Sequence, residues 1–263
     1  MTIAMVTGGN QGLGLALVRG LCRAGHEVYL TARDRGRGER AVELLRTEGL
    51  DPRLEVLDVR DDVSVKGLAA TIAERHGGVD IVISNAAARI SPGVSNADQV
   101  REFVDTNNHG TARVIEAFAP LLNDDGRYVV VASFFGTLHH LPEQLWPLFD
   151  GDIGRVMDDY VAAVEGGTAE RLGWPEWINV PSKVGQVAAM RALARSVDRS
   201  RGIVVNAACP GLVDTDASRP WFDDMSRALS PDDAAVDVLW LATGSGLPYG
   251  ELVQYRKVLP FHP

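Results

Sequence analysis

The stretch Thr7-Gly8-Gly9-Asn10-Gln11-Gly12-Leu13-Gly14 decides the fold of this chain. An apolar run, Ile3–Val6, precedes it and predicts a buried strand, and apolar residues at helical spacing follow it. A strand, a glycine-rich turn and a helix together place a pyrophosphate at a helix N-terminus, where free N–H groups and the helix dipole favour negative charge. We expect Gly8 to permit the tight turn, Gly12 to admit phosphates closely, and Gly14 to let the helix pack on the sheet.

Composition limits the classes of protein that fit. Strand-like and helix-like segments alternate through all 263 residues without a Pro/Ser-rich linker, which predicts one α/β domain over residues 1–263. A formal net charge of −9 argues against a nucleic-acid partner. The two cysteines, Cys22 and Cys209, lack metal-ligand spacing and fit a reducing compartment. With no signal peptide and no apolar run long enough for a membrane, we expect a cytoplasmic protein without a metal.

Arg33 follows the second predicted strand, Glu27–Thr31. In nicotinamide enzymes the end of this strand meets the adenosine ribose, where an acidic residue accepts from the 2′-hydroxyl and an arginine accommodates a 2′-phosphate. Arg33 therefore favours NADPH over NADH, and Arg35 or Arg37 could assist. The alternative is a solvated arginine on a basic loop.

The spacing Thr-Gly-x-x-x-Gly-x-Gly resembles that of the short-chain dehydrogenase/reductase family, and more closely its monomeric carbonyl reductases. The segments Leu30-Thr31-Ala32-Arg33-Asp34 and Ala208-Cys209-Pro210-Gly211 also resemble that subgroup. The resemblance implies an α/β fold with a Rossmann-type, doubly wound parallel sheet of about seven strands and a helical insertion. It also implies NADP(H) as the cofactor.

The resemblance assigns cofactor-binding residues along the chain. Gln11 stands where these reductases usually carry a lysine that touches the phosphate, which should weaken the NADPH preference without reversing it. Asp58 is expected to contact the adenine amino group, and Ala87 replaces a glycine beside the ribose. The expected cofactor-binding residues are Gly8, Asn10, Gln11, Gly12, Leu13, Gly14, Arg33, Asp58, Val59, Asn85, Ala86, Ala87, Lys183, Pro210, Gly211, Val213 and Thr215.

The expected catalytic residues are Ser133, Lys183, Asn107 and Asn179. Ser133 follows a predicted strand, Arg127–Ala132, at the carboxyl edge where α/β sheets bind ligands. By resemblance, Ser133 should bond the substrate oxygen, and the backbone of Asn107 should hold a water linked to Lys183. Asn107 is also compatible with a purely structural role as an asparagine that kinks its helix.

Asn179 is the main departure from the family pattern, Tyr-x-x-x-Lys, because it stands where the tyrosine belongs, four residues before Lys183. An amide cannot supply the proton that the phenol gives in carbonyl reduction, but it can donate a hydrogen bond to developing negative charge. That chemistry suits an enolate formed by reduction of an enone C=C bond. Alternatively, Asn179 is only a helix N-cap with Pro181 in the first turn. The chain could also be a non-redox enzyme, such as a cyclase or isomerase, or an NADPH-binding regulatory protein.

Two further segments shape the predicted substrate site. The resemblance implies an insertion at about 139–178, with a helix near Ile153–Val164, that would cover the faces used for tetramer formation and so keep the protein a monomer. It also implies a substrate lid at about 216–229. Aromatic residues in both segments indicate a small-molecule substrate that is bulky and apolar. The expected pocket residues are Phe134, Phe135, Trp177, Trp221 and Met225.

Overall fold

The computed structural model describes residues 2–263 and contains one sheet in the order β3-β2-β1-β4-β5-β6-β7-β8. All neighbouring strands are parallel except β7 and β8. The strands are β1 (Ile3–Val6), β2 (Glu27–Ala32), β3 (Arg53–Val56), β4 (Val79–Ser84), β5 (Leu122–Val131), β6 (Val204–Ala208), β7 (Leu252–Gln254) and β8 (Lys257–Leu259). The order reverses between β1 and β4, so the crevice for a ligand is expected at their carboxyl ends.

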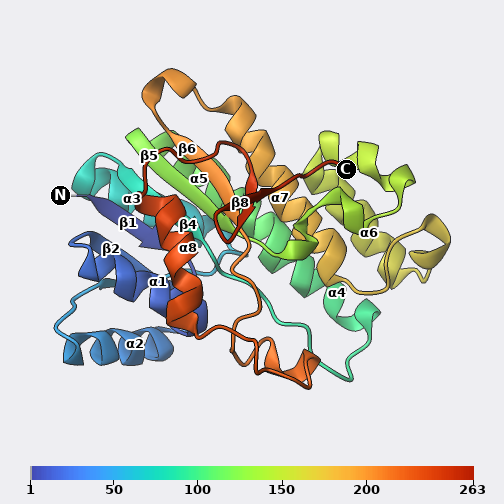
Figure 1. Ribbon diagram of the computed structural model, residues 1–263, viewed down its shortest axis with the longest axis horizontal. Helices are drawn as coiled ribbons and strands as arrows, with labels where there is room; N and C mark the ends of the chain where they lie inside the picture. Colours follow the sequence, from blue (N-terminus) through green and yellow to red (C-terminus); the bar gives the residue numbers. More distant parts are fainter. Residues whose placement is uncertain (1) are drawn as a thin grey trace.

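Helices cover both faces of this sheet (Figure 1). The residues of α1, α2 and α8 share one buried apolar cluster, and those of α3, α4, α5 and α7 share the other. The helices are α1 (Gly12–Arg23), α2 (Arg35–Thr47), α3 (Asp62–His76), α4 (Asn96–Val104), α5 (Gly110–Phe118), α6 (Ile153–Glu165), α7 (Asn179–Ser196) and α8 (Pro231–Thr243). This two-sided arrangement confirms the predicted doubly wound α/β fold.

Helices α4 and α5 are joined by a π-helical segment, η1 (Asp105–His109), that contains Asn107. A π-helical turn inside a long helix changes its course and frequently marks a functional site. The expected irregularity at Asn107 is therefore present, and its side chain is buried.

The segment before α7 is built from short 3₁₀ turns and one longer helix. These are η4 (Leu138–His140), η5 (Glu143–Asp150), α6 (Ile153–Glu165) and η6 (Glu170–Leu172), so the helix predicted in this region is present. In Figure 1 this segment (yellow-green, right) lies on the side of the molecule away from α2. Its own core contains Phe149 and Tyr160, whose rings contact Trp174 at centroid distances of 6.3 and 4.8 Å.

The sheet has eight strands rather than the seven predicted, because a hairpin follows β7. The turn uses Tyr255 and Arg256, which both have positive φ (50° and 60°). Hairpin turns of this kind usually carry Asn-Gly or Asp-Gly, so the sequence offered no ordinary turn signal for β8.

Candidate active site

The glycine-rich turn lies between β1 and α1 and requires its glycines. Gly8 and Gly12 have φ of 65° and 52°, a region that side chains rarely adopt. A Cβ on Gly14 would lie 2.1 Å from the Gly8 carbonyl oxygen. The side-chain amide of Asn85, just after β4, donates to the Thr7 carbonyl at 2.9 Å, and this bond ties the two strand ends together.

The N-terminus of α1 is open to an anion. Within residues 2–263, no side chain caps this helix at Gln11, and its first turn carries no acidic residue. By contrast, α2, α3 and α6 are capped by Asp34, Asp61 and Asp152. Free N–H groups, the helix dipole and a cradle too narrow for a Cβ fit a dinucleotide pyrophosphate.

Arg33 lies at the carboxyl end of β2 with its side chain 61% exposed, and its Nη1 is 3.9 Å from Glu102 Oε1. The neighbouring acid, Asp34, accepts from the Arg37 backbone N–H at 2.7 Å and so caps α2. Its carboxylate is therefore engaged away from a ribose hydroxyl. This arrangement leaves the guanidinium of Arg33 accessible at the place where a 2′-phosphate would lie.

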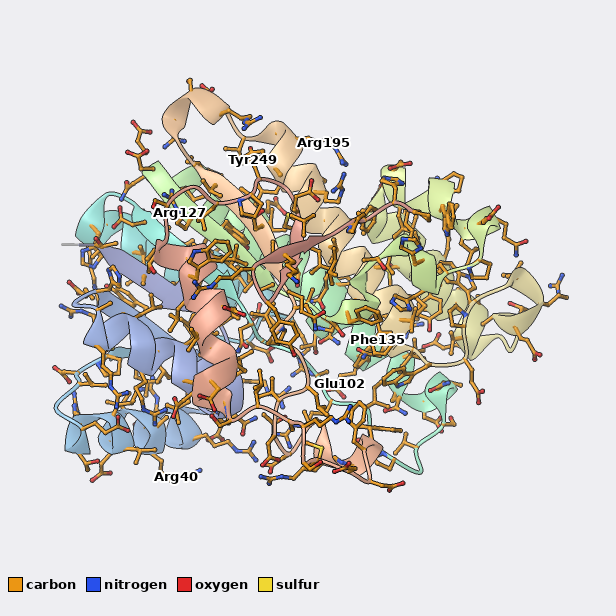
Figure 2. All side chains as sticks on the ribbon, in the orientation of Figure 1. Arg40, Glu102, Arg127, Phe135, Arg195 and Tyr249 are labelled. Carbon is orange, nitrogen blue, oxygen red and sulfur yellow. The ribbon has the colours of Figure 1, made fainter. Side chains whose placement is uncertain are left out.

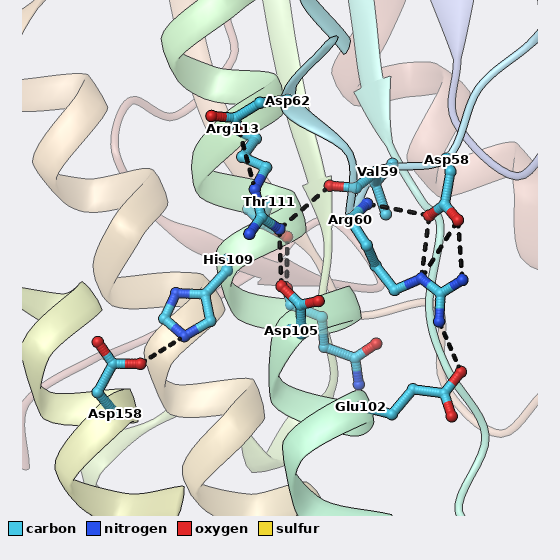
Figure 3. Close-up of polar contacts among 11 residues, drawn as sticks. Asp58, Val59, Arg60, Asp62, Glu102, Asp105, His109, Thr111, Arg113 and Asp158 are labelled. Atoms are coloured by element: carbon cyan, nitrogen blue, oxygen red, sulfur yellow. Dashed lines mark hydrogen bonds and ion pairs between the residues drawn. The ribbon is translucent and has the colours of Figure 1, made fainter. Parts of the chain in front are cut away.

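Asp58 is engaged by Arg60 (Figure 3). The guanidinium of Arg60 donates to both carboxylate oxygens and also reaches Glu102 at 2.8 Å. These hydrogen bonds hold the pKa of Asp58 below its usual value. An adenine contact through Asp58 would therefore have to share a carboxylate that Arg60 already binds.

A cleft of about 400 Å³ lies at the carboxyl ends of the strands and brings the predicted catalytic residues together. Ser133, Lys183, Asn107 and Asn179 all line it. It is also lined by the predicted cofactor residues Ala87, Gly211, Val213 and Thr215, and by the predicted pocket residues Phe134, Phe135, Trp177 and Trp221. Thr215 connects the cleft with the glycine-rich turn, because its Cγ2 lies 3.3 Å from where a Cβ on Gly12 would stand.

Met225 is not among the described residues that line the cleft, so its role as a pocket residue stays a prediction. The lid segment turns at Arg219–Trp221 and presents Trp221 and Phe222 to the cleft. Met225 lies beyond this turn, where its carbonyl accepts from the Ala228 N–H at 2.9 Å.

Asn179 is the first residue of α7, and Ile178 occupies the cap position. In the part of the chain that the structure describes, no side chain caps this helix, so the interpretation of Asn179 as an N-cap is wrong. Asn179 and Lys183 are one helical turn apart and both line the cleft. Both residues therefore lie on the face of α7 that borders the cleft.

Ser133 lies two residues after the end of β5 and caps a 3₁₀ turn, where its Oγ accepts from the Phe135 N–H at 3.4 Å. This contact uses an oxygen lone pair and leaves the hydroxyl proton for a ligand. Phe135 (labelled in Figure 2) packs edge-on against Trp177 with ring centroids 4.8 Å apart. The hydroxyl thus opens into a cleft with one aromatic wall.

Lys183 is surrounded by protein, and burial lowers its pKa to about 8. Its Nζ donates to Gln186 Oε1 at 2.7 Å. The thiol of Cys209, at the end of β6, also lines the cleft, and burial raises its pKa. With a pKa of about 8, most of the Lys183 ammonium is protonated at pH 7.

Several residues at this site were not anticipated from the sequence. Arg89, Cys209 and Gln254 line the cleft, and Gln186 contacts Lys183. Arg89 lies two residues after the Ser84-Asn85-Ala86-Ala87 segment, which was a usable signal. Gln186 is on the same helical face as Lys183, three residues later, a second signal that was available.

No helix within residues 2–263 is long and apolar enough to cross a membrane. Over the same range, no group of three or more His, Cys, Asp or Glu side chains is placed to hold a metal ion.

The parallel sheet, the glycine-rich turn and the polar cleft at the strand ends define a Rossmann-type dinucleotide-binding enzyme. The profile of the short chain dehydrogenase family matches residues 2–144. Carbonyl reductase (NADPH) 3 of Rattus norvegicus is 34% identical in an alignment of 271 residues that covers 97% of each chain. Carbonyl reductase (NADPH) 1 of Pongo abelii is 33% identical over 98% of each chain. The chain belongs to the short chain dehydrogenase family.

A solved structure, salutaridine reductase from Papaver somniferum, superposes with a TM-score of 0.81 and 25% identity. The match covers 96% of this chain and 99% of that one.

Proposed function

We propose that the chain is an NADPH-dependent reductase that acts on a bulky, largely apolar ketone or enone. The relatives named NADPH carbonyl reductases support the cofactor and the reaction class. The observation that carries the proposal is the shared cleft of Ser133, Asn179 and Lys183, with aromatic walls beside them.

NADPH, when bound, supplies the hydride. The hydroxyl of Ser133 and the amide N–H of Asn179 donate hydrogen bonds to the substrate oxygen as negative charge develops there. The ammonium of Lys183 binds the nicotinamide ribose and adds a positive charge to the same wall. The aromatic residues Phe135 and Trp177 exclude water from the apolar part of the substrate.

Enone reduction is the form of the reaction that best suits these groups. Among the described residues that line the cleft there is no tyrosine, histidine or carboxylate. A ketone oxygen would have to be protonated without these common acids. An enolate formed from an enone needs only hydrogen-bond donors, and its α-carbon can take a proton from water.

Substitution of Asn179 tests the proposal directly. We expect Asn179→Ala to lower turnover of a cyclic enone by ~10²-fold, because one oxyanion donor is lost. Asn179→Tyr should raise reduction of a simple activated ketone and impair the enone. Asn123→Ala, an asparagine on β5 outside the cleft, is the control and should match the parent protein. Unchanged enone turnover in Asn179→Ala would refute the role of this amide.

NADPH oxidation measured together with product separates the reductase from its rivals. A reductase consumes one NADPH for each product formed. A cyclase or isomerase would form product without consuming NADPH, and a regulatory protein would bind NADPH without turnover.

We also propose that the protein is a cytoplasmic monomer. The support is the packing of α6 of the insertion over α7, where a Cβ on Gly185 would lie 2.9 Å from Met157 Sδ. Arg101 of α4 pairs with Glu165 of α6, so the insertion also holds the outer face of α4. Light scattering that shows a stable tetramer would refute the monomer. The two free cysteines, Cys22 and Cys209, suit a reducing compartment.

A further inference from the structure

The ammonium of Lys183 is held by a second residue of its own helix. Gln186, three positions later on α7, accepts from Lys183 Nζ at 2.7 Å. Gln186 is only 2% exposed, so its carboxamide cannot exchange this partner freely for bulk water. A buried carboxamide must also find an acceptor for its own N–H groups.

That acceptor lies on the neighbouring helix. Gln186 Nε2 donates to Thr111 Oγ1 at 3.1 Å, and Thr111 Oγ1 donates to the Asn107 carbonyl at 2.6 Å. Thr111 is 3% exposed. The orientation of the Gln186 carboxamide is therefore fixed in this series of hydrogen bonds. Its oxygen faces the Lys183 ammonium, and its nitrogen faces the Thr111 hydroxyl.

Asn107 connects this chain to the wall of the cleft on the other side. Its Oδ1 accepts from the Ala88 N–H at 2.7 Å, on the loop after β4 that lines the cleft. Asn107 lies in the π-helical segment. Its side chain bonds the loop after β4, and its carbonyl bonds Thr111 of α5. Asn107 therefore connects the loop after β4 with Lys183 on α7.

We propose that Gln186 is a positioning residue that fixes Lys183 through Thr111 to the carbonyl of Asn107. In the family that the sequence resembles, a water links the corresponding asparagine carbonyl to the lysine. Here two buried side chains make that connection. The bond to Gln186 leaves the other N–H groups of the ammonium for the cofactor ribose and the substrate. The inference rests on the proposed function for the role of Lys183.

The electrostatics around Lys183 give the proposal a measurable consequence. Burial lowers the pKa of Lys183, and a hydrogen bond to a neutral acceptor favours its charged form against that effect. Cys209 is the titratable group that acts on it, and Arg89 lines the same cleft. Removing the acceptor should therefore lower the pKa of Lys183 further, whereas a carboxylate at the same place should raise it.

The test is an NMR titration of the lysine ε-methylene signals. The chain has only three lysines, Lys66, Lys183 and Lys257, and Lys183 is the only one of the three that is not exposed. We expect Gln186→Met, which keeps the length of the side chain without the acceptor, to lower the midpoint of the Lys183 signal. Gln186→Glu should raise it by about 1–3 units.

Ser182→Ala is the matched control. Ser182 Oγ donates to Asn108 Oδ1 at 2.8 Å, a buried bond from α7 to the π-helical segment η1 that does not involve Lys183. This variant should lose stability but leave the Lys183 midpoint unchanged. Thr111→Val is the second variant, because it keeps the lysine contact and only frees the carboxamide. It should shift the midpoint in the direction of Gln186→Met, but less.

Calorimetry with NADPH gives a second readout. We expect Gln186→Met to weaken NADPH binding about tenfold at pH 8 and Ser182→Ala to leave it unchanged. A folded Gln186→Met protein with the parent midpoint and affinity would overturn the inference. Shifted midpoints in a protein that never oxidises NADPH would support the positioning role and overturn only the proposed reductase function.

Discussion

The nucleotide-binding part of the molecule, β1 to β4, and the catalytic part, from Ser133 to α7, differ in how far they keep the family pattern. The first part keeps its glycines, its open helix N-terminus and Arg33 at the end of β2. In the second part Ser133 and Lys183 line the cleft, and the expected departure from the family pattern is Asn179, four residues before Lys183. The family match ends at residue 144, before this difference is reached. We therefore expect cofactor binding and chemistry to respond separately to substitutions in the two parts.

The largest expected effect concerns the catalytic part. Ser133→Ala should lower turnover by ~10²–10³-fold, because the substrate oxygen loses a hydrogen-bond donor, while NADPH affinity stays unchanged. Ser95→Ala removes the cap of α4, outside the cleft, and should cost stability alone. Steady-state kinetics together with NADPH calorimetry measures both. A parallel loss of affinity and turnover in Ser133→Ala would contradict the separation of the two parts.

The next effect concerns the nucleotide-binding part. In Gly14→Ala the new methyl group would meet the Gly8 carbonyl oxygen at 2.1 Å, so the turn must open. We expect NADPH affinity to fall about 100-fold, or ~2.7 kcal/mol. Gly67→Ala is the control: no described atom lies within 4 Å of its added Cβ, and a helical alanine should stabilise α3 by about 0.5–1 kcal/mol. Calorimetry showing parent-like affinity for Gly14→Ala would be incompatible with a phosphate site at this turn.

The smallest effect concerns cofactor choice. Arg33→Ala should narrow the affinity ratio of NADPH to NADH about tenfold, since the guanidinium for a 2′-phosphate is lost. Glu102→Gln should widen the ratio modestly, because it removes the carboxylate 3.9 Å from Arg33. Arg46→Ala, an arginine at the far end of α2 paired with Asp51, serves as the control. Equal affinities for both cofactors in the parent protein would remove the basis for this role of Arg33.

Local patterns made the fold and part of the site predictable from the sequence. The strand Ile3–Val6 and the turn at Gly8–Gly14 follow from an apolar run and from glycine spacing, and both are confirmed. The features of the site that the sequence did not predict depend on long-range packing. The contacts of Gln186 with Thr111 depend on how α7 meets α5, and no spacing within either helix specifies them.

The start of α7 at Asn179 also shows that local residue preferences do not fix every structural detail. Asparagine favours the N-cap position, yet α7 begins one residue earlier than that preference predicts.

The hairpin of β7 and β8 has a consequence for how the molecule behaves at high concentration. Without β8, the hydrogen-bonding edge of β7 would be exposed and could template pairing with another chain. β8 covers that edge with only three residues, carries the exposed Lys257, and is followed by Pro260, which has no N–H to donate. The sheet therefore ends in a short, charged strand that resists edge-to-edge aggregation.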